Sequence, residues 1–235
     1  MPEQRFRFKQ FSIEQDRCAM KVGTDGVTLG AWTETHGAKR ILDIGTGTGL
    51  LALMMAQRVP EAQIDAVEID EAAAEQASVN ITASPWAERI RVHWMDARRL
   101  HTKEPYDLII CNPPYYMGEM AAPDPRLTVA KHGAELTFDQ LVDVVDKLLA
   151  DRGRFAVIVP SDGEHRLRLA GERVGLSVFR RGPLWYLEGR PFKRVLLELW
   201  RGAPQDPHDP VIVERAPGEY TEAYKQLLAP FLLKF

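Results

Sequence analysis

The sequence predicts one α/β domain built on a mostly parallel sheet. From residue 40 to about residue 159, short apolar runs of strand length alternate with longer amphipathic segments. Strands that alternate with helices form βαβ units, whose strands lie parallel. At 235 residues the chain is long enough to bury one substantial core. We therefore expect one domain over residues 1–235, with its core at residues 39–201.

The first strand of this core runs into a glycine loop. The strand is Ile41–Ile44, and Gly45–Gly49 has glycine at every second position. Beyond Leu50, apolar residues recur with the spacing of a buried helix face. Strand, glycine loop and helix in this order let a nucleotide-like ligand approach a helix N-terminus closely. The G-x-G-x-G spacing, with no Gly-Lys-Ser/Thr after it, argues against NAD and ATP.

Acidic residues end the next two predicted strands. Gln63–Glu68 is the second strand, and Glu68 lies about twenty residues past the glycines, where a carboxylate accepts hydrogen bonds from ribose hydroxyls. Ile90–Trp94 is the third strand and leads to Asp96. Because parallel strands end at one edge of a sheet, we expect both carboxylates beside the glycine loop.

The fourth strand, Leu108–Cys111, ends in Asn112-Pro113-Pro114-Tyr115. The side-chain oxygen of Asn112 can accept one N–H of an amine, and the carbonyl of Pro113 can accept the other. Tyr115 can stack on the planar group that carries the amine. Alone, these four residues fit a proline-rich turn equally well. Their position after the glycine loop and both acidic strand ends favours a site for an exocyclic amine or amide nitrogen.

These four features resemble the class I S-adenosylmethionine-dependent methyltransferases that modify amino groups. The resemblance implies a Rossmann-like fold: a mostly parallel seven-stranded sheet, helices on both faces and an antiparallel last hairpin. It implies S-adenosyl-L-methionine as cofactor. The implied cofactor-binding residues are Asp43, Gly45, Gly47 and Gly49 in the loop, Glu68 at the ribose and Asp96 at the adenine. The implied catalytic residues are Asn112, Pro113 and Tyr115.

Further segments resemble the bacterial tRNA adenine-N6 methyltransferases. They are Phe8–Phe11, Asp16–Gly26, Leu29–Trp32, Ser84–Ile90, Tyr115–Tyr116 and Tyr220–Tyr224. This resemblance implies methylation of the adenine 3′ of the anticodon, in tRNA1(Val), with the anticodon stem-loop as the binding partner. In that family the leading segment, here residues 1–38, covers the methionine end of the cofactor, which would bring Thr24 and Asp25 near it.

The charge distribution bears on the RNA substrate. The net charge is −3, which is not typical of a general nucleic-acid-binding protein. Between Arg166 and Arg201, however, nine basic residues stand against three acidic ones. A local basic surface for one RNA stem-loop is one interpretation, and a solvated arginine-rich hairpin is the other. The candidate substrate contacts are Pro114, Tyr116, Lys131, Arg180, Arg181, Lys193 and Arg194.

The remaining segments complete the expected fold. We expect a hairpin within residues 5–21, a helix at 26–35, a substrate-gated loop at 116–136 and an amphipathic helix from Phe138 to Leu149. A helix near 164–174 and an antiparallel hairpin from strands at 176–185 and 194–200 follow. Residues 202–235 are expected to form a C-terminal loop, reaching Pro217, and an amphipathic helix at 220–233.

Composition narrows the cellular setting. No apolar run approaches the roughly 20 residues of a membrane span, and the polar N-terminus has no signal-peptide core. Two cysteines make no disulfide framework and fit a reducing cytoplasm. Six scattered histidines show no zinc-ligand spacing.

Three alternatives stay open. Asn-Pro-Pro-Tyr serves a carboxamide equally well, so a protein-glutamine methyltransferase is one; enzymes resembling that group usually carry a helical domain before the glycine loop, and only about forty residues precede it here. A DNA adenine methyltransferase is another, although such enzymes tend to have a sizeable target-recognition domain. The third is a cofactor-binding RNA chaperone without turnover.

Overall fold

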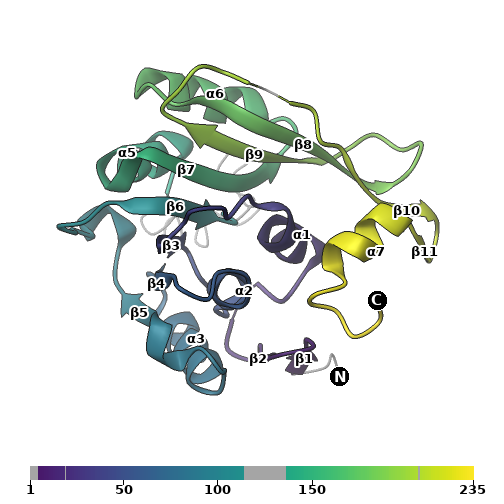
Figure 1. Ribbon diagram of the computed structural model, residues 1–235, viewed down its shortest axis with the longest axis horizontal. Coiled ribbons are helices and arrows are strands. Elements are labelled where there is room, and N and C mark those ends of the chain that lie inside the picture. Colours follow the sequence, from purple (N-terminus) through teal and green to yellow (C-terminus); the bar gives the residue numbers. More distant parts are fainter. Residues whose placement is uncertain (1–4, 19, 114–135, 206) are drawn as a thin grey trace, which may run out of the picture.

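A nine-stranded sheet forms the centre of the protein. The computed structural model describes residues 5–18, 20–113, 136–205 and 207–235. The strands of the described chain that build this sheet are β3 (Arg40–Ile44), β4 (Gln63–Glu68), β5 (Ile90–Trp94), β6 (Tyr106–Cys111), β7 (Leu149–Pro160), β8 (Ser177–Leu187), β9 (Arg194–Trp200), β10 (Val211–Ala216) and β11 (Glu219–Tyr220). Their order across the sheet is β11-β10-β8-β9-β7-β6-β3-β4-β5 (Figure 1).

Strands β3 to β7 run parallel, so their carboxyl ends share one edge of the sheet. Strand β9 runs antiparallel between β7 and β8, which confirms the antiparallel hairpin expected after the parallel core. This arrangement confirms the α/β class with a mostly parallel sheet. Ligands of open α/β sheets bind in the crevice outside the carboxyl ends of the strands. We call this edge the carboxyl edge.

Helices cover both faces of the sheet (Figure 1). One face carries α1 (Thr24–Trp32), α2 (Leu50–Arg58), α3 (Glu71–Thr82) and α7 (Glu222–Leu228), and the other carries α5 (Phe138–Leu148) and α6 (Glu164–Arg173). Successive residues of β6 show the consequence, since Ile110 packs into the first layer and Ile109 into the second. Because both faces are buried, the central strands read as continuous apolar runs.

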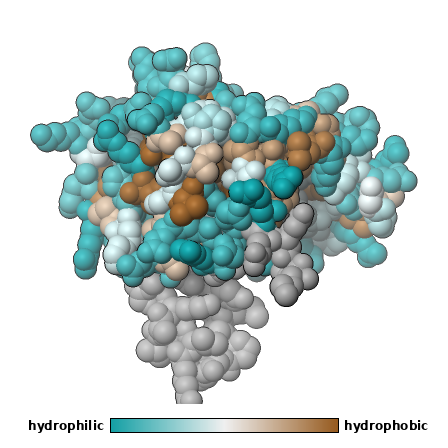
Figure 2. Space-filling model, turned by 90° about the horizontal axis from the view of Figure 1, so that it is seen from below, coloured by the Kyte–Doolittle hydropathy of each residue, from teal (hydrophilic) through white to brown (hydrophobic). Residues whose placement is uncertain are grey.

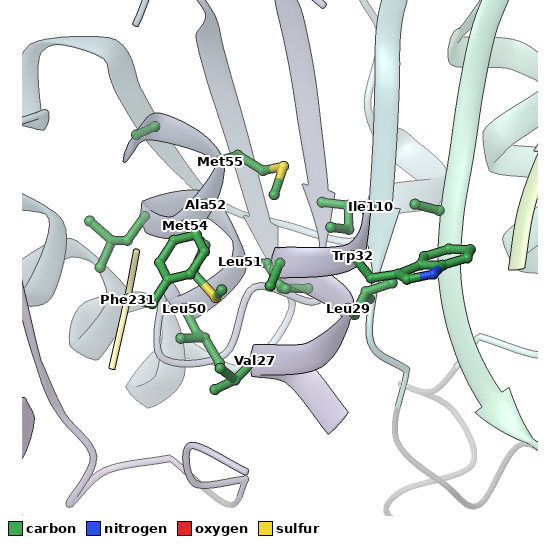
Figure 3. Packing of buried hydrophobic residues seen from close by; sticks show 14 of the residues in the cluster. Val27, Leu29, Trp32, Leu50, Leu51, Ala52, Met54, Met55, Ile110 and Phe231 are labelled. Atoms are coloured by element: carbon green, nitrogen blue, oxygen red, sulfur yellow. The ribbon is translucent and has the colours of Figure 1, made fainter. Parts of the chain in front are cut away.

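The helix layer of α1 and α2 is packed closely at Gly30 of α1. A Cβ at Gly30 would lie 2.6 Å from the sulfur of Met54 and 3.3 Å from Leu51. Figure 3 shows this layer, with α1 side chains such as Leu29 beside Leu51 of α2 and Phe231 beside Met54. The tight contact fixes α1 against the helix that follows the glycine loop.

Local sequence explains where α5 begins. The hydroxyl of Thr137 accepts a hydrogen bond from the backbone N–H of Gln140 at 3.2 Å, and the side chain of Gln140 accepts one from the N–H of Thr137 at 3.0 Å. This capping box satisfies two N–H groups that a helix terminus leaves without partners. The apolar face expected from Phe138 onward is buried against the sheet, which confirms that prediction.

The N-terminal prediction is also confirmed, with different bounds. A two-stranded antiparallel hairpin, β1 (Arg5–Arg7) and β2 (Ser12–Glu14), precedes α1. Phe8, in the hairpin turn, forms a bridge with Leu232 near the other end of the chain. The face seen from below in Figure 2, which carries this hairpin and α3, has small apolar patches among hydrophilic side chains. Within the described ranges, no helix has the length and apolarity to cross a membrane.

Two expectations about the C-terminal part were wrong. Residues 201–217 are not only a loop, because β10 adds parallel to β8 and buries Val211 and Val213; with β11, the sheet therefore has nine strands rather than seven. The expected helix at 220–233 is only α7, which ends at Leu228. Ala229 still has helical backbone, and Pro230 after it has no backbone N–H with which to continue the helical hydrogen bonds.

Candidate functional site

A cavity of about 250 Å³ opens at the carboxyl edge, over β3, β4, β5 and β6. Its lining residues come from the glycine loop, from three strand ends, from α3 and α5, and from the segment before α1. They are Cys18, Met20, Ile44, Gly45, Gly47, Val67, Glu68, Ile69, Asp70, Ala73, Met95, Asp96, Ala97, Cys111, Asn112, Pro113, Leu136 and Leu141. Mostly apolar walls with a few converging polar groups are typical of a small-molecule site. Four separately predicted segments thus meet in one place.

The three glycines of the loop serve two different purposes. Gly45, Gly47 and Gly49 have backbone φ angles of 71°, 55° and 84°, which residues other than glycine rarely adopt. A Cβ at Gly45 or Gly47 would meet no atom within 4 Å, because both border the cavity. At Gly49, outside the cavity, it would lie 3.6 Å from Ala77 of α3. The first two glycines leave room for a ligand, whereas at Gly49 the positive φ explains the glycine, because a contact of 3.6 Å is an ordinary one.

Asp43 lies behind the loop and does not line the cavity. One carboxylate oxygen accepts hydrogen bonds from the Thr46 hydroxyl at 2.6 Å and from the Ala52 N–H at 3.1 Å. Burial raises the pKa of Asp43 to about 7. Its contacts hold the loop to the first turn of α2, so any effect of Asp43 on a cofactor passes through the loop.

Glu68 lines the cavity with its carboxylate fixed by backbone groups. One oxygen accepts the N–H of Gly47 at 2.9 Å. The other accepts the N–H groups of Ile69 at 2.9 Å and Asp70 at 3.0 Å. The side chain is nearly buried, so this end of β4 presents an oriented acceptor beside the glycine loop.

Asp96 also lines the cavity, but its carboxylate is already paired with a cationic side chain of this protein. The guanidinium of Arg98 donates to both carboxylate oxygens at 2.6–2.9 Å. This hydrogen-bonded pairing holds the pKa of Asp96 below its usual range. Asp96 is therefore an ionised carboxylate, although Arg98 already occupies part of its acceptor capacity.

Asn112 directly follows β6 at the cavity, and its buried side-chain oxygen has no hydrogen-bond partner among the described residues. A buried acceptor without a donor costs about 1–3 kcal/mol, so this oxygen is suited to a donor supplied by a ligand. Gly26 of α1 lies close by, since a Cβ there would be 3.4 Å from the Asn112 side-chain nitrogen.

Several predicted residues are not placed by this geometry. Pro114, Tyr115, Tyr116 and Lys131, with nearly all of the expected loop at 116–136, lie outside the described residues. Pro113 is buried at the cavity, next to Asn112.

The predicted cofactor-binding residues on α1 do not line the cavity. They are Thr24 and Asp25, which begin α1. Asp25 is buried and accepts hydrogen bonds from the hydroxyl of Tyr186 and, at 3.0 Å, from Arg194 Nε. It ties α1 to β8 and β9.

Three arginines expected to contact RNA have internal partners. Arg180 lies 4.0 Å over the ring of Trp32 and pairs with Asp209. The other two are Arg181, which pairs with Glu164 at 2.6 Å, and Arg194, which pairs with Asp25 at 3.0 Å. Each guanidinium is thus already paired with an acidic residue distant in sequence, and contact of these arginines with RNA stays a prediction. Lys193 is exposed and forms no ion pair with a described residue.

Sequence reasoning missed the attachment of the segment at 14–22 that supplies Cys18 and Met20 to the cavity. Asn80 of α3 accepts the Glu14 N–H at 2.8 Å and donates to the Glu14 carbonyl at 2.9 Å. Gln76, one turn earlier, accepts the Arg17 N–H at 2.8 Å. Both amides are buried. Two amides four residues apart in an alanine-rich helix were the available signal.

No group of three or more His, Cys, Asp or Glu in the described ranges is arranged to hold a metal ion.

Comparison with known proteins shows the family to which this chain belongs. Residues 28–159 match the family described as the methyltransferase small domain. The chain is 43% identical over 234 residues to the tRNA1(Val) (adenine(37)-N6)-methyltransferase of Yersinia pestis (strain Pestoides F), covering 98% of this chain and 94% of that protein. The same identity and share of this chain hold for the enzyme of that name from Yersinia pseudotuberculosis serotype O:3 (strain YPIII), with 92% of that protein covered.

Solved structures agree on the fold. A protein of Agrobacterium tumefaciens described as a predicted O-methyltransferase superposes with a TM-score of 0.69 at 17% identity, covering 88% of this chain and 96% of that one. A TehB-like SAM-dependent methyltransferase from Corynebacterium glutamicum superposes with a TM-score of 0.52 at 17% identity, covering 77% and 89%. The fold is that of class I S-adenosylmethionine-dependent methyltransferases, and the chain belongs to the tRNA1(Val) (adenine(37)-N6)-methyltransferase family.

Proposed function

We propose that this protein methylates the N6 amine of an adenine in tRNA, with S-adenosyl-L-methionine as methyl donor. The finer proposal is the adenine 3′ of the anticodon in tRNA1(Val), bound through the anticodon stem-loop. The similarity to enzymes of that name over nearly the whole chain supports the reaction. The observation that carries it is the buried oxygen of Asn112, which has no hydrogen-bond partner among the described residues and lies next to Pro113 at the cavity.

The cavity fits the proposed cofactor. Glu68 offers an oriented carboxylate to ribose hydroxyls, and the open sides of Gly45 and Gly47 leave space beside the loop. Apolar wall residues such as Ile69 and Met95 suit the face of an adenine ring. When bound, S-adenosylmethionine supplies a methyl group on a positively charged sulfur. The chain's own task is then to position the acceptor nitrogen.

Asn112 and Pro113 act on the target amine in this mechanism. The amine of adenine is a weak nucleophile because its lone pair is delocalised into the ring. If the Asn112 side-chain oxygen and the Pro113 carbonyl each accept one of its N–H groups, a tetrahedral nitrogen with a localised lone pair is favoured. The methylated nitrogen is cationic and acidic and loses its extra proton to water, while the Asn112 oxygen only accepts a hydrogen bond, so no strong base is required.

Tyr115 is proposed as the platform on which the target base stacks, with Pro114, Tyr116 and Lys131 as further substrate contacts. The base has to leave its stack to reach the cavity, and a single-stranded anticodon loop makes that step inexpensive. A carboxamide nitrogen of a protein glutamine could use the same two acceptors, so the experiment has to distinguish the two substrates.

The test is transfer of labelled methyl from S-adenosylmethionine to unmodified bacterial tRNA, followed by nucleoside analysis. We expect N6-methyladenosine with the wild-type protein, and about 10²–10³-fold slower transfer with Asn112→Ala, the cost typical of removing one group of a preorganised site. Cofactor affinity should change little. Gln57→Ala, which alters a hydrogen bond to Pro230 elsewhere, is the control. Wild-type turnover by Asn112→Ala would refute the mechanism, and label in protein glutamine would refute the tRNA assignment.

The finer proposal has its own substrates. A synthetic anticodon stem-loop of tRNA1(Val) should be methylated, and the same stem-loop with guanine in place of the adenine 3′ of the anticodon should not. Equal methylation of both would place the target elsewhere in the tRNA.

A further inference from the structure

The nine basic residues between Arg166 and Arg201 fall into two groups. Six form ion pairs with acidic side chains. They are Arg168, Arg173, Arg180, Arg181, Arg194 and Arg201. The other three, Arg166, Arg190 and Lys193, are exposed and have no ion pair with any described residue. The abundance of arginine in this segment therefore reduces to three available cations.

These three cations lie at the carboxyl edge. Strand β9 starts at Arg194, which is paired with Pro160, the last residue of β7. The carbonyl of Lys193 accepts the N–H of Ser161 at 3.1 Å, so Lys193 adjoins the end of that parallel strand. Arg190 lies in the turn between β8 and β9, where its N–H donates to the carbonyl of Leu187.

Arg166 joins this cluster to the cavity. It lies in the first turn of α6, and its guanidinium is 5.9 Å from the ring centre of Phe138. Phe138 begins α5, whose next turn supplies Leu141 to the cavity wall. The cluster thus borders the β7 side of the site. We call Arg166, Arg190 and Lys193 the basic rim.

The hairpin that carries Arg190 and Lys193 is held by aromatic contacts. Phe192 packs edge-on against Trp185 with ring centres 5.0 Å apart. The guanidinium of Arg181 lies 5.9 Å from the Phe192 ring and is itself paired with Glu164 of α6. These contacts link the hairpin to α6, so cations from both elements are presented on a common frame.

The opposite flank of the cavity is acidic. Asp70 and Glu71 lie at the N-terminus of α3, whereas Glu75, one turn later, is paired with Arg17 at 3.4 Å. Burial, and then the charges of Glu68, Asp70 and Asp16, raise the pKa of the Cys18 thiol in the cavity wall to about 11. A polyanion approaching the cavity is therefore repelled on the α3 side and attracted on the β7–β9 side.

We propose that the basic rim binds backbone phosphates of the RNA that flanks the methylated adenine. This inference rests on the proposed function and adds the side from which the RNA enters. Phosphate contacts give affinity and register without reading bases. The rim should therefore affect RNA binding strongly and the methyl-transfer step little.

The test compares two triple variants that remove equal charge. The rim variant is Arg166→Ala/Arg190→Ala/Lys193→Ala. The matched control, Arg168→Ala/Arg173→Ala/Arg215→Ala, removes three ion-paired cations. Affinity for unmodified tRNA is measured from 50 to 300 mM salt, with kcat at saturating tRNA and cofactor affinity alongside. Unchanged cofactor affinity establishes that each variant is folded.

The expected result separates the two variants. In the rim variant, tRNA affinity at 150 mM salt should fall about tenfold or more, and the slope of log affinity against log salt should become shallower by about one for each phosphate that is no longer neutralised. The control should differ from wild type by much less. Equal slopes and affinities in the two variants would overturn the inference, even with the wild-type protein active on tRNA. An inactive wild-type protein would instead overturn the proposed function.

Discussion

The two halves of the carboxyl edge differ in how their polar and charged groups are satisfied. In the half built from β3, β4, β5 and α3, polar groups are enclosed and fixed by backbone N–H groups, as the three hydrogen bonds to Glu68 show. In the half built from β7, β8, β9 and α6, charged side chains meet each other in ion pairs or remain exposed. A small cofactor needs a shaped, desolvated surface, whereas an RNA backbone needs charges in water on a rigid frame.

Helix α1 belongs to neither half and contacts both Asn112 at the cavity and β9 of the second half. Asp25 of α1 pairs with Arg194 of β9, and the next residue, Gly26, lies beside Asn112. This pair is the place where a change in one half can reach the other. Substitutions on either side of it test how independent the halves are.

The largest expected effect comes from breaking that pair. Arg194→Ala leaves the buried Asp25 carboxylate without its cation, and the free energy of unfolding should fall by about 3 kcal/mol, in the range for breaking a buried pair. Urea denaturation measures it. Asp25→Asn/Arg194→Ala should recover part of the loss, because the uncompensated charge is gone. Equal instability of the single and double variants would show that the pair is not the link.

Glu68→Ala should weaken cofactor binding in the half built from β3, β4, β5 and α3, without an effect on the half built from β7, β8, β9 and α6. It leaves the N–H groups of Gly47, Ile69 and Asp70 without their acceptor, and hydrogen bonds to charged groups contribute about 1.5–3 kcal/mol each. We expect a rise of about 100-fold in the Kd for S-adenosylmethionine by calorimetry, with an unchanged salt dependence of tRNA binding. Glu71→Ala, in the exposed first turn of α3, is the control. A changed salt slope would mean that the halves are not separable.

A smaller effect should follow from releasing the segment at 14–22. Gln76→Ala removes the hydrogen bond that holds Arg17, next to Cys18 of the cavity wall, on α3. It leaves the glycine loop alone, whereas Asn80 also donates to the Thr48 carbonyl of that loop at 2.9 Å. We expect the cofactor Kd to rise severalfold but by less than about tenfold, since one such bond contributes about 1 kcal/mol. Gln57→Ala should not change it. A lowered melting temperature with an unchanged Kd would show that the segment is structural and not a cover.

The pH dependence of stability gives the smallest expected change within any single pH unit. Because burial raises the pKa of Asp43 to about 7, the folded protein retains a proton that the unfolded chain releases near pH 4. The folded state therefore binds more protons between those values, and stability falls as pH rises from about 4 to 7, by at most about 1.4 kcal/mol per pH unit. Asp43→Asn should flatten this part of the melting-temperature profile. Parallel profiles for both proteins would contradict the assignment.

Much of the fold and the centre of the site could be predicted from the sequence. The strand, the glycine loop and the helix after it are set by local periodicity and by glycines at positive φ, which residues near in sequence determine. Because the strands are parallel, their carboxyl ends share one edge, and Glu68, Asp96 and Asn112, which lie at or just after those ends, meet there. The β10 strand was missed because its alternating pattern lies among prolines and gains its burial only against β8.

What only the tertiary structure decided is which polar groups are already occupied. The sequence shows Arg194 and Lys193 as neighbouring cations, but Arg194 pairs with Asp25, 169 residues away, and Lys193 forms no ion pair with a described residue. Likewise Asp43 faces Thr46 and Ala52 rather than the cavity. Local patterns determine backbone and strand ends, whereas the availability of a charge depends on partners brought close by folding. Sequence therefore located the site, and the structure separated the residues that build it from those available to bind.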